Sequence, residues 1–204
     1  MTDLAGLAHL IRERSAGARR YMVAIAGAPA SGKSTLAENL ANTLSAGGEA
    51  AVVVPMDGFH FDDIILNARG QHPRKGAPFT FDVAGFDVLL KRIRSGEPDI
   101  AIPVFDRAME LSRAAAGIVG EEARIILVEG NYLLLKQPPW NRLRPLFDFS
   151  IFLNVPREEL ERRLIRRWLD HGFDMTYAVN WIASNDGPNI MEVITNSAAA
   201  DWTV

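Results

Sequence analysis

The 204-residue chain contains no cysteine. It therefore forms no disulfide bond, builds no thiolate metal site and carries no cysteine nucleophile. A chain without disulfides suits a reducing compartment. A single chain of this length also buries a substantial core without covalent staples.

Long apolar runs and an excess of charge of one sign are missing as well. No stretch approaches the roughly 18 uninterrupted apolar residues of a membrane span, and the first ten residues lack the basic start and apolar run of a secretory signal. The net charge of −3 gives no indication of a nucleic-acid or anionic-membrane partner. These absences predict a cytoplasmic protein, and the length favours a single domain over residues 1–204.

Strand and helix patterns alternate along the chain. Five apolar, β-branched runs predict strands, and most are continuous, as expected where both faces of a strand are covered. They are Tyr21–Ala26, Ala51–Met56, Arg124–Glu129, Phe149–Asn154 and Trp202–Val204. Helical patterns cover Ser34–Leu44, the stretch from the N-cap candidate Asp82 to about Ser95, and a long segment opened by Pro156 in its first turn. The alternation predicts an α/β fold of three layers, with a parallel sheet between helices.

Two segments interrupt this alternation. Ile100–Val119 is expected to be a hairpin or lid-like insert. Asn67–Thr80 is the longest loop-like stretch, and long loops in compact domains are often functional.

One segment matches the phosphate-loop pattern G-x-x-x-x-G-K-[ST]. An apolar strand leads into it and a helix leads out, so an ordinary glycine turn is the weaker interpretation. Glycines let the backbone wrap closely around phosphate, and the loop amides with the next helix N-terminus point at the anion. The expected nucleotide-binding residues are Gly27, Ala28, Pro29, Ala30, Ser31, Gly32, Lys33, Ser34 and Thr35. Lys33 is expected to bridge the β- and γ-phosphates of ATP, and Ser34 to bind Mg²⁺.

Two acids stand at the ends of predicted strands, where ligands gather in an open parallel sheet. Glu129 is expected beside the phosphate loop as a metal ligand, unless it merely faces solvent. Asp57 is expected to take or orient the proton of an attacking hydroxyl, unless it caps the turn with Gly58. His60 is a candidate for contacting the acceptor, with a packed structural histidine as the alternative. For the stretch His60–Asp63, in which Asp63 opens an apolar run, helix capping is favoured over a metal site.

Arginines are concentrated in the helix after Pro156. Glu158 and Glu159 lie four residues before Arg162 and Arg163, so ion pairs explain those two. Arg166 and Arg167 have no such acid and are the candidates for stabilising the transferred phosphoryl group. Four basic residues are weaker candidates for the acceptor side: Arg69, Arg74, Lys75 and Arg107.

Five ordered motifs together resemble the superfamily of phosphoribulokinase, uridine kinase and bacterial pantothenate kinase. They are Gly27–Ser34, Met56–His60, Lys75–Asp82, Val104–Arg107 and Val128–Tyr132. Within it, the sequence most resembles the small bacterial branch labelled nucleoside/nucleotide kinase-like or fructose transport system kinase. The resemblance implies the sheet order 2-3-1-4-5, Asp57 as catalytic base, and acceptor contacts near His60, Arg107 and Tyr132. Relatives are often dimers, so a homodimer is a further expectation.

Two parts of the resemblance leave roles open. In the lid region, about residues 156–175, the family often has a further arginine and aspartate after the Arg-Arg pair, where this chain has Asp170-His171. Which arginines act therefore stays open. The segment Ser184–Asn189 also resembles the bacterial branch, with a role near the nucleotide base as one hypothesis.

The sequence thus predicts an ATP- and Mg²⁺-dependent kinase acting on a hydroxyl of a sugar, a nucleoside or a pantothenate-like alcohol. The main alternative is a P-loop NTPase that acts as a switch, although a guanine-reading Asn-Lys-x-Asp motif is missing. The other alternative, a module that binds ATP without chemistry, does not explain why Lys33, Ser34, Asp57 and Glu129 are all present.

Overall fold

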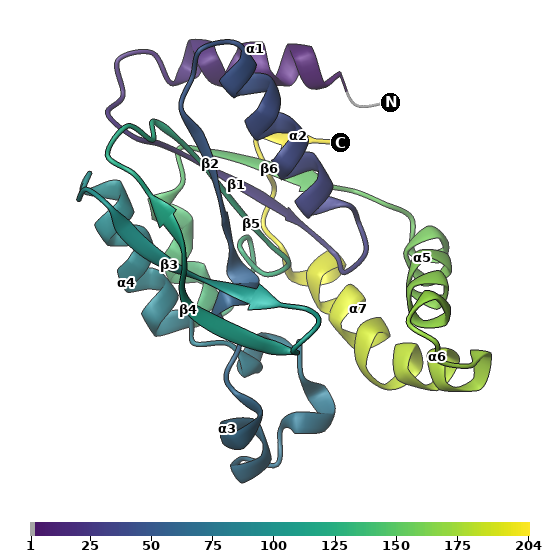
Figure 1. Cartoon of the computed structure of the whole chain (residues 1–204). Helices are drawn as coiled ribbons and strands as arrows, with labels where there is room; N and C mark the ends of the chain where they lie inside the picture. The colour runs from purple at the N-terminus through teal and green to yellow at the C-terminus, as the bar shows by residue number, and fades with distance from the viewer. Residues whose placement is uncertain (1–2) are drawn as a thin grey trace.

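The computed structural model describes residues 3–204 and is built around a five-stranded parallel sheet (Figure 1). The strand order is β2-β5-β1-β6-β7. The strands are β1 (Tyr21–Gly27), β2 (Ala51–Pro55), β5 (Ile125–Gly130), β6 (Phe149–Leu153) and β7 (Trp202–Thr203). Counted among the sheet strands alone, this is the order 2-3-1-4-5, and the predicted fold class is confirmed.

Helices cover both faces of the sheet because its strands are apolar on both sides. Val23 and Ile25 of β1 face the core under α1 (Leu4–Arg14) and α2 (Lys33–Ala46). Met22 and Ala24 face the opposite core, under α4 (Val83–Arg94) and α7 (Gly187–Asn196). The continuous apolar runs in the sequence are therefore explained by burial on two faces.

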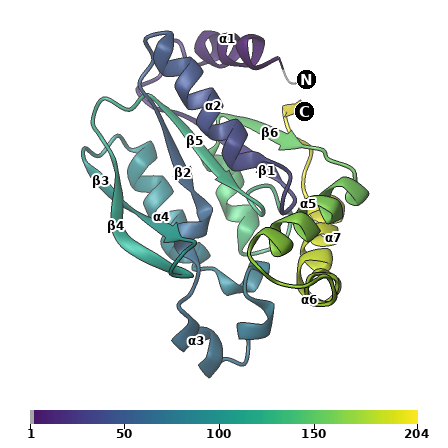
Figure 2. The ribbon, with the colours of Figure 1, turned by 45° about the vertical axis from the view of Figure 1, so that its right-hand side comes forward.

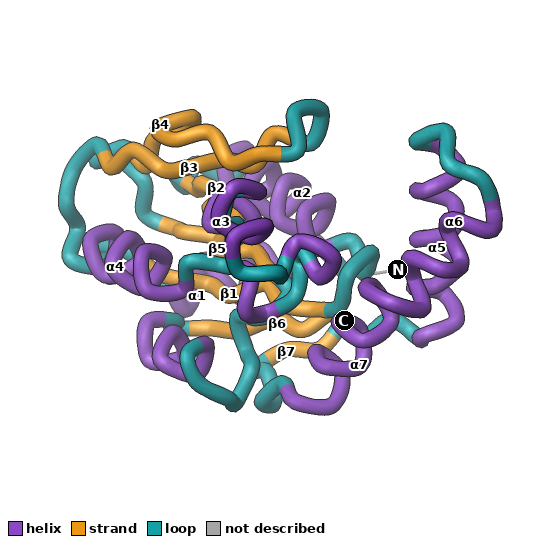
Figure 3. Tube along the Cα trace, turned by 90° about the horizontal axis from the view of Figure 1, so that it is seen from below, coloured by secondary structure: helices purple, strands orange, loops and turns teal. Residues whose placement is uncertain are grey.

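The predicted hairpin is present as a separate antiparallel pair, β3 (Ile100–Asp106) and β4 (Leu111–Val119). Seen from below, it lies beyond the β2 edge of the main sheet (Figure 3). On the opposite side, α5 (Arg157–Asp170) and α6 (Met175–Trp181) pack together and project next to α7 (Figure 2). The edge at which the parallel strands end is thus flanked by the hairpin on one side and by α5 on the other.

Several local predictions are refined by the structure. Asp82 is the N-cap of α4, as expected: its Oδ1 accepts a hydrogen bond from the Gly85 amide at 2.9 Å. Pro156 is the N-cap residue of α5 and not part of its first turn. The helix α3 (Asp63–Ala68) is capped by Asp62, whose side chain accepts a hydrogen bond from the Ile64 amide, so the capping expected within His60–Asp63 is present.

The segment predicted as a long loop is partly helical. Asn67 and Ala68 complete α3, and short 3₁₀ turns form at His72–Arg74 and Pro78–Thr80. A π-helical turn at Ile182–Asp186, which the sequence did not predict, links α6 to α7. Within residues 3–204, no helix is long and apolar enough to cross a membrane.

Candidate active site

The phosphate loop connects β1 to α2, with α2 beginning at Lys33. Gly32 has φ +97°, a left-handed conformation that glycine adopts without steric cost. Ala30 is also left-handed, with φ +63°, although it carries a Cβ. Local strain of this kind persists only where surrounding contacts hold the loop, and it is common at ligand-binding sites.

Polar groups of the loop are buried and turned inward. The Lys33 ammonium is buried and donates to the Ala28 carbonyl at 3.0 Å. Burial lowers the pKa of Lys33 to about 8, against the opposing effect of Glu129 and Asp57. The Ser31 hydroxyl is also buried and has no hydrogen-bond partner among the described residues. An anion such as a phosphate would satisfy both groups.

Arg163 contacts the phosphate loop from α5, which sequence reasoning missed. Its Nη1 donates to the carbonyls of Ala30 and Ser31, both at 3.2 Å, while its Nε donates to Glu159 at 2.6 Å. Because an acid lies four residues earlier, the sequence alone predicts only an ion pair for Arg163. A usable signal was its spacing of four residues from Arg167, which places both on one face of the helix.

Ser34 and Glu129 lie side by side at the head of α2. The Ser34 hydroxyl donates to Glu129 Oε1 at 3.3 Å, and Glu129 is 7% exposed. Burial, followed by the nearby charge of Asp57, raises the pKa of Glu129. A hydroxyl and a buried carboxylate are the oxygen ligands that Mg²⁺ prefers. These two residues, the predicted metal ligands, therefore fit a magnesium ion, which would also compensate the buried carboxylate.

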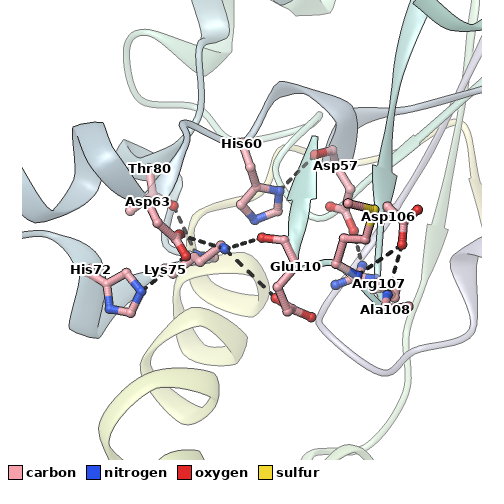
Figure 4. A network of polar contacts seen from close by, with 12 residues as sticks. Asp57, His60, Asp63, His72, Lys75, Thr80, Asp106, Arg107, Ala108 and Glu110 are labelled. Carbon is pink, nitrogen blue, oxygen red and sulfur yellow. Dashed lines mark hydrogen bonds and ion pairs between the residues drawn. The ribbon is translucent and has the colours of Figure 1, made fainter. Parts of the chain in front are cut away.

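Asp57 occupies a 3₁₀ turn, Met56–Phe59, directly after β2. Its Oδ2 accepts a hydrogen bond from Arg107, which lies in the turn between β3 and β4 (Figure 4). Glycine follows Asp57 for a packing reason, since a Cβ at Gly58 would overlap the Pro103 carbonyl of β3. The close approach of hairpin and turn thus brings Arg107 to Asp57.

A cavity of about 130 Å³ lies between Asp57, which follows β2, and Ser34 at the start of α2. Its lining consists of Ser34, Pro55, Asp57, Val104, Phe105, Arg107 and Glu129. The cavity therefore brings together four residues that the sequence predicted for the site: Ser34, Glu129, Asp57 and Arg107. This volume fits only part of a metabolite, and an adjoining cavity of about 380 Å³ shares Ser34, Pro55, Val104 and Glu129 with it.

His60 lies beside this cavity and is held in one orientation. Its Nδ1 donates to the Asp57 carbonyl at 2.9 Å, which leaves Nε2 as an acceptor. The ring packs between Phe81 and Phe105, with centroids 4.0 and 4.8 Å away. Burial lowers the pKa of His60. Burial therefore favours the neutral ring, and the packed and functional interpretations of this histidine are compatible.

Two predicted acceptor contacts are placed elsewhere. The Tyr132 side chain is fully buried, and its hydroxyl donates to the Gly76 carbonyl at 2.6 Å. Burial raises its pKa well above the ordinary value. Arg69 stacks over the Phe61 ring at 4.4 Å. The Tyr132 hydroxyl thus supports the segment that contains Gly76. Neither Tyr132 nor Arg69 lines the cavity next to Asp57.

The two arginines proposed for catalysis differ in position. Arg166 has a side chain 80% exposed and lies 3.6 Å from Asp170. Arg167 lies near Arg107, Asp57 and Asp186, and has no ion pair within 4 Å among residues 3–204. Desolvation, followed by the charge of Arg107, lowers the pKa of Arg167. The structure therefore brings Arg167 toward the site and leaves Arg166 in solvent.

A parallel sheet of this order, with a phosphate loop after its central strand, defines a P-loop α/β protein. The comparison with family models identifies the kinase branch of that class: residues 22–199 match the "Phosphoribulokinase / Uridine kinase family". The chain belongs to this family of ATP-dependent kinases. The resemblance predicted from five motifs is thereby confirmed.

Similar proteins cover nearly the whole chain. "Uncharacterized protein YggC" of Escherichia coli (strain K12) is 36% identical over 188 residues, which are 91% of this chain and 78% of that protein. "Putative uridine kinase C227.14" of Schizosaccharomyces pombe is 32% identical over 192 residues, 90% of this chain and 82% of that protein. A crystal structure of a "putative fructose transport system kinase" from Silicibacter sp. TM1040 matches with a TM-score of 0.95 and 44% identity, and the match covers 100% of both chains. A shared fold does not by itself define a substrate.

Proposed function

We propose that this protein transfers the γ-phosphate of ATP to a hydroxyl group of a small metabolite. The observation that carries the proposal is the single cavity lined by Ser34 and Glu129 from the phosphate-loop side and by Asp57 and Arg107 from the opposite side. A nucleotide-binding module without chemistry has no use for a carboxylate facing the phosphate end of its loop.

Asp57 is the proposed base. It takes the proton of the acceptor hydroxyl while that oxygen forms a bond to the γ-phosphorus, and the bond from this phosphorus to the β-phosphate oxygen breaks. The products are ADP and a phosphorylated acceptor. Arg107 holds the Asp57 carboxylate before the acceptor arrives, so it is placed to bind the acceptor once Asp57 turns to the hydroxyl.

Lys33 and Arg167 provide the positive charge for the transferred phosphoryl group. Arg163 holds the loop carbonyls of Ala30 and Ser31 and so keeps the loop amides directed at the phosphates. Ser34 and Glu129 are the groups that would hold Mg²⁺, which when bound neutralises phosphate charge.

Two observations support a polyhydroxy compound as the acceptor. The names of similar proteins refer to uridine and fructose, and both compounds present hydroxyl groups. Within the cavity next to Asp57, Arg107 is a hydrogen-bond donor and Phe105 is an apolar surface. This combination suits a polyol with a small apolar or ring face, as sugars and nucleosides have.

The test is ATP consumption with Mg²⁺ across a panel of sugars, nucleosides and pantothenate. Acceptor-dependent turnover is expected for at least one class, and Asp57→Asn should reduce it by about 10²–10⁴-fold, the usual range for general-base catalysis. Binding of ATP to the variant should be unchanged, because Asp57 lies outside the phosphate loop. Turnover independent of acceptor and of Asp57 would favour a nucleotide-hydrolysing switch instead.

A further inference from the structure

Two buried asparagines in the segment Ser184–Asn189 are hydrogen-bonded to each other through their side-chain amides. Asn185 and Asn189 are 2% and 3% exposed, and the Asn189 amide donates to Asn185 Oδ1 at 3.4 Å. Asn185 lies in the π-helical turn before α7. A π-helical turn shifts the register of side chains and often occurs at functional sites, so the irregularity directs Asn185 toward the neighbouring loop.

The pair binds the segment His72–Thr80 at two adjacent residues. Arg74 donates from Nε to Asn185 Oδ1 at 3.2 Å and from Nη2 to Asn189 Oδ1 at 3.1 Å. The Asn185 amide donates in turn to the Lys75 carbonyl at 2.9 Å. Each polar group of Asn185 therefore has a partner more than 100 residues away in sequence.

Lys75 carries this connection to the β3–β4 turn, residues 107–110. Its ammonium donates to the Glu110 carbonyl at 2.7 Å and lies 2.8 Å from Asp63 Oδ1 (Figure 4). The side chain is only 15% exposed. The same turn holds Arg107 at Asp57. A continuous series of contacts thus runs from Asn185 through Lys75 and the turn to the proposed catalytic base.

We propose that Asn185 is a positioning residue for the acceptor side of the site. By fixing the Lys75 carbonyl, it sets where the Lys75 ammonium reaches the β3–β4 turn, and so where Arg107 lies relative to Asp57. The inference rests on the proposed function for its catalytic meaning, but the positioning itself is a property of the free protein. It also assigns the segment to the acceptor side and not to the nucleotide base.

A second anchor of the hairpin limits the size of the effect. The Ser112 hydroxyl donates to the Gly58 carbonyl, so the base of β4 stays attached when Lys75 is displaced. The backbone amides of Ala108 and Met109 in the turn itself both donate to Asp106 Oδ1 at 3.1 Å. These two amides report the order of the turn independently of the Ser112 anchor.

The first experiment measures hydrogen–deuterium exchange in the free protein with three variants. Asn185→Ala removes all three side-chain hydrogen bonds of Asn185, those with Arg74, Lys75 and Asn189. Asn185→Asp keeps an acceptor for Arg74 but places a carboxylate oxygen against the Lys75 carbonyl. Asn189→Ala is the matched control, because it removes an acceptor of Arg74 and leaves the bond between Asn185 and Lys75.

Exchange at Ala108 and Met109 is expected to rise about fivefold in both Asn185 variants, the change that the loss of one typical hydrogen bond produces. Asn189→Ala should change it less than twofold. Amides of β5 should exchange as before in all three variants, which separates local loosening from general destabilisation. Exchange at Ala108 and Met109 that stays at the wild-type rate in Asn185→Ala, or in Asn185→Asp, would overturn the proposal.

Lys75→Met provides an independent check on the path. It preserves the Lys75 carbonyl for Asn185 but removes the ammonium that holds Glu110. The turn should loosen at least as much as in Asn185→Ala. A turn that stays ordered in Lys75→Met would show that the connection ends at the loop, and the proposal would fail.

Kinetics then link positioning to function. With an acceptor found in the panel, Asn185→Ala should raise the acceptor KM or lower kcat by several-fold while leaving the ATP KM unchanged. A general folding defect would affect both substrates. If no acceptor in the panel supports turnover, the exchange data still decide the positioning, so failure of the proposed function and failure of this inference are distinguishable.

Discussion

The two halves of the site are built in different ways. The phosphate side consists mainly of nine consecutive residues, Gly27–Thr35, whose backbone and first helical turn make most of the binding groups. The acceptor side combines the end of β2, the segment before α4, the β3–β4 turn and the π-helical turn before α7. Its contacts are made by side chains and join residues that are far apart in the sequence. Arg107 and Asp57 are 50 positions apart, and Asn185 and Lys75 are 110 positions apart.

This difference has a physical consequence. A loop closed by local hydrogen bonds is stabilised by its own short segment, whereas contacts between distant segments depend on the folded core for their geometry. Substitutions on the phosphate side should therefore impair nucleotide binding directly. Substitutions on the acceptor side should leave nucleotide binding intact and change how the acceptor is placed.

After Asp57→Asn, the largest effect is expected for Lys33→Met. Loss of the charge that meets the phosphates should lower turnover by about 10²–10³-fold and weaken ATP binding. Stability should not fall, because burial already lowers the pKa of Lys33 to about 8 and methionine fills the same space without a charge. Isothermal titration with an ATP analogue and thermal unfolding test the two parts. A variant that binds nucleotide normally would contradict the assigned role.

Arg107→Met should change the acceptor side alone. The acceptor KM is expected to rise about tenfold, since a charged hydrogen bond contributes roughly 1.5–3 kcal/mol, with ATP affinity unchanged. Arg113→Met is the matched control: Arg113 lies on the same hairpin but pairs with Asp106 at 3.4 Å. Steady-state kinetics with the acceptor identified in the panel distinguish the two. Equal effects of both variants would mean that the hairpin as a whole, and not Arg107, matters.

An effect of similar size is expected at one of the two adjacent arginines of α5 and a much smaller one at the other. Arg167→Ala should slow turnover by about tenfold, because a charge near the transferred phosphoryl group is lost. Arg166→Ala should stay within twofold, since exposed ion pairs such as that with Asp170 contribute little. Single-turnover rates measure the difference. If Arg166→Ala were the slower enzyme, the helix would have to rotate on nucleotide binding.

How far the sequence could predict the site follows the same division. The phosphate loop, Glu129 and Asp57 were predictable, because each lies at the end of an apolar strand and parallel strands end at one edge. Sheet order followed from family resemblance, since strand patterns alone do not state which strands pair. Tyr132 was misjudged: the sequence places it two residues after Gly130, yet its hydroxyl is used by Gly76.

The remaining errors concern side chains with more than one available partner. Arg163 had an acid at the right helical spacing, and its position four residues before Arg167 did not identify the loop carbonyls as its partners. Family resemblance singled out the segment of Asn185, but the sequence did not identify its partners, because they lie on another segment and its direction depends on a π-helical turn. Contacts of this kind arise from tertiary packing, and the spacing of residues along the sequence does not identify the partners.

The smallest expected effect is a pH dependence of stability that originates at His60, between the two halves. Burial lowers the pKa of His60 below the ordinary 6.5. As pH falls through 6.5, His60 takes up a proton in the unfolded chain but not in the folded protein. The free energy of unfolding is therefore higher above this pH and decreases below it. His60→Asn should therefore flatten the fall in unfolding free energy between pH 7.5 and 5.5, whatever it costs in packing at both values. Urea unfolding at the two pH values measures the slope, with the surface variant His9→Gln as control. An unchanged slope in His60→Asn would mean that the folded protein protonates this ring as readily as the unfolded chain does, and that Nε2 is open to solvent on the acceptor side.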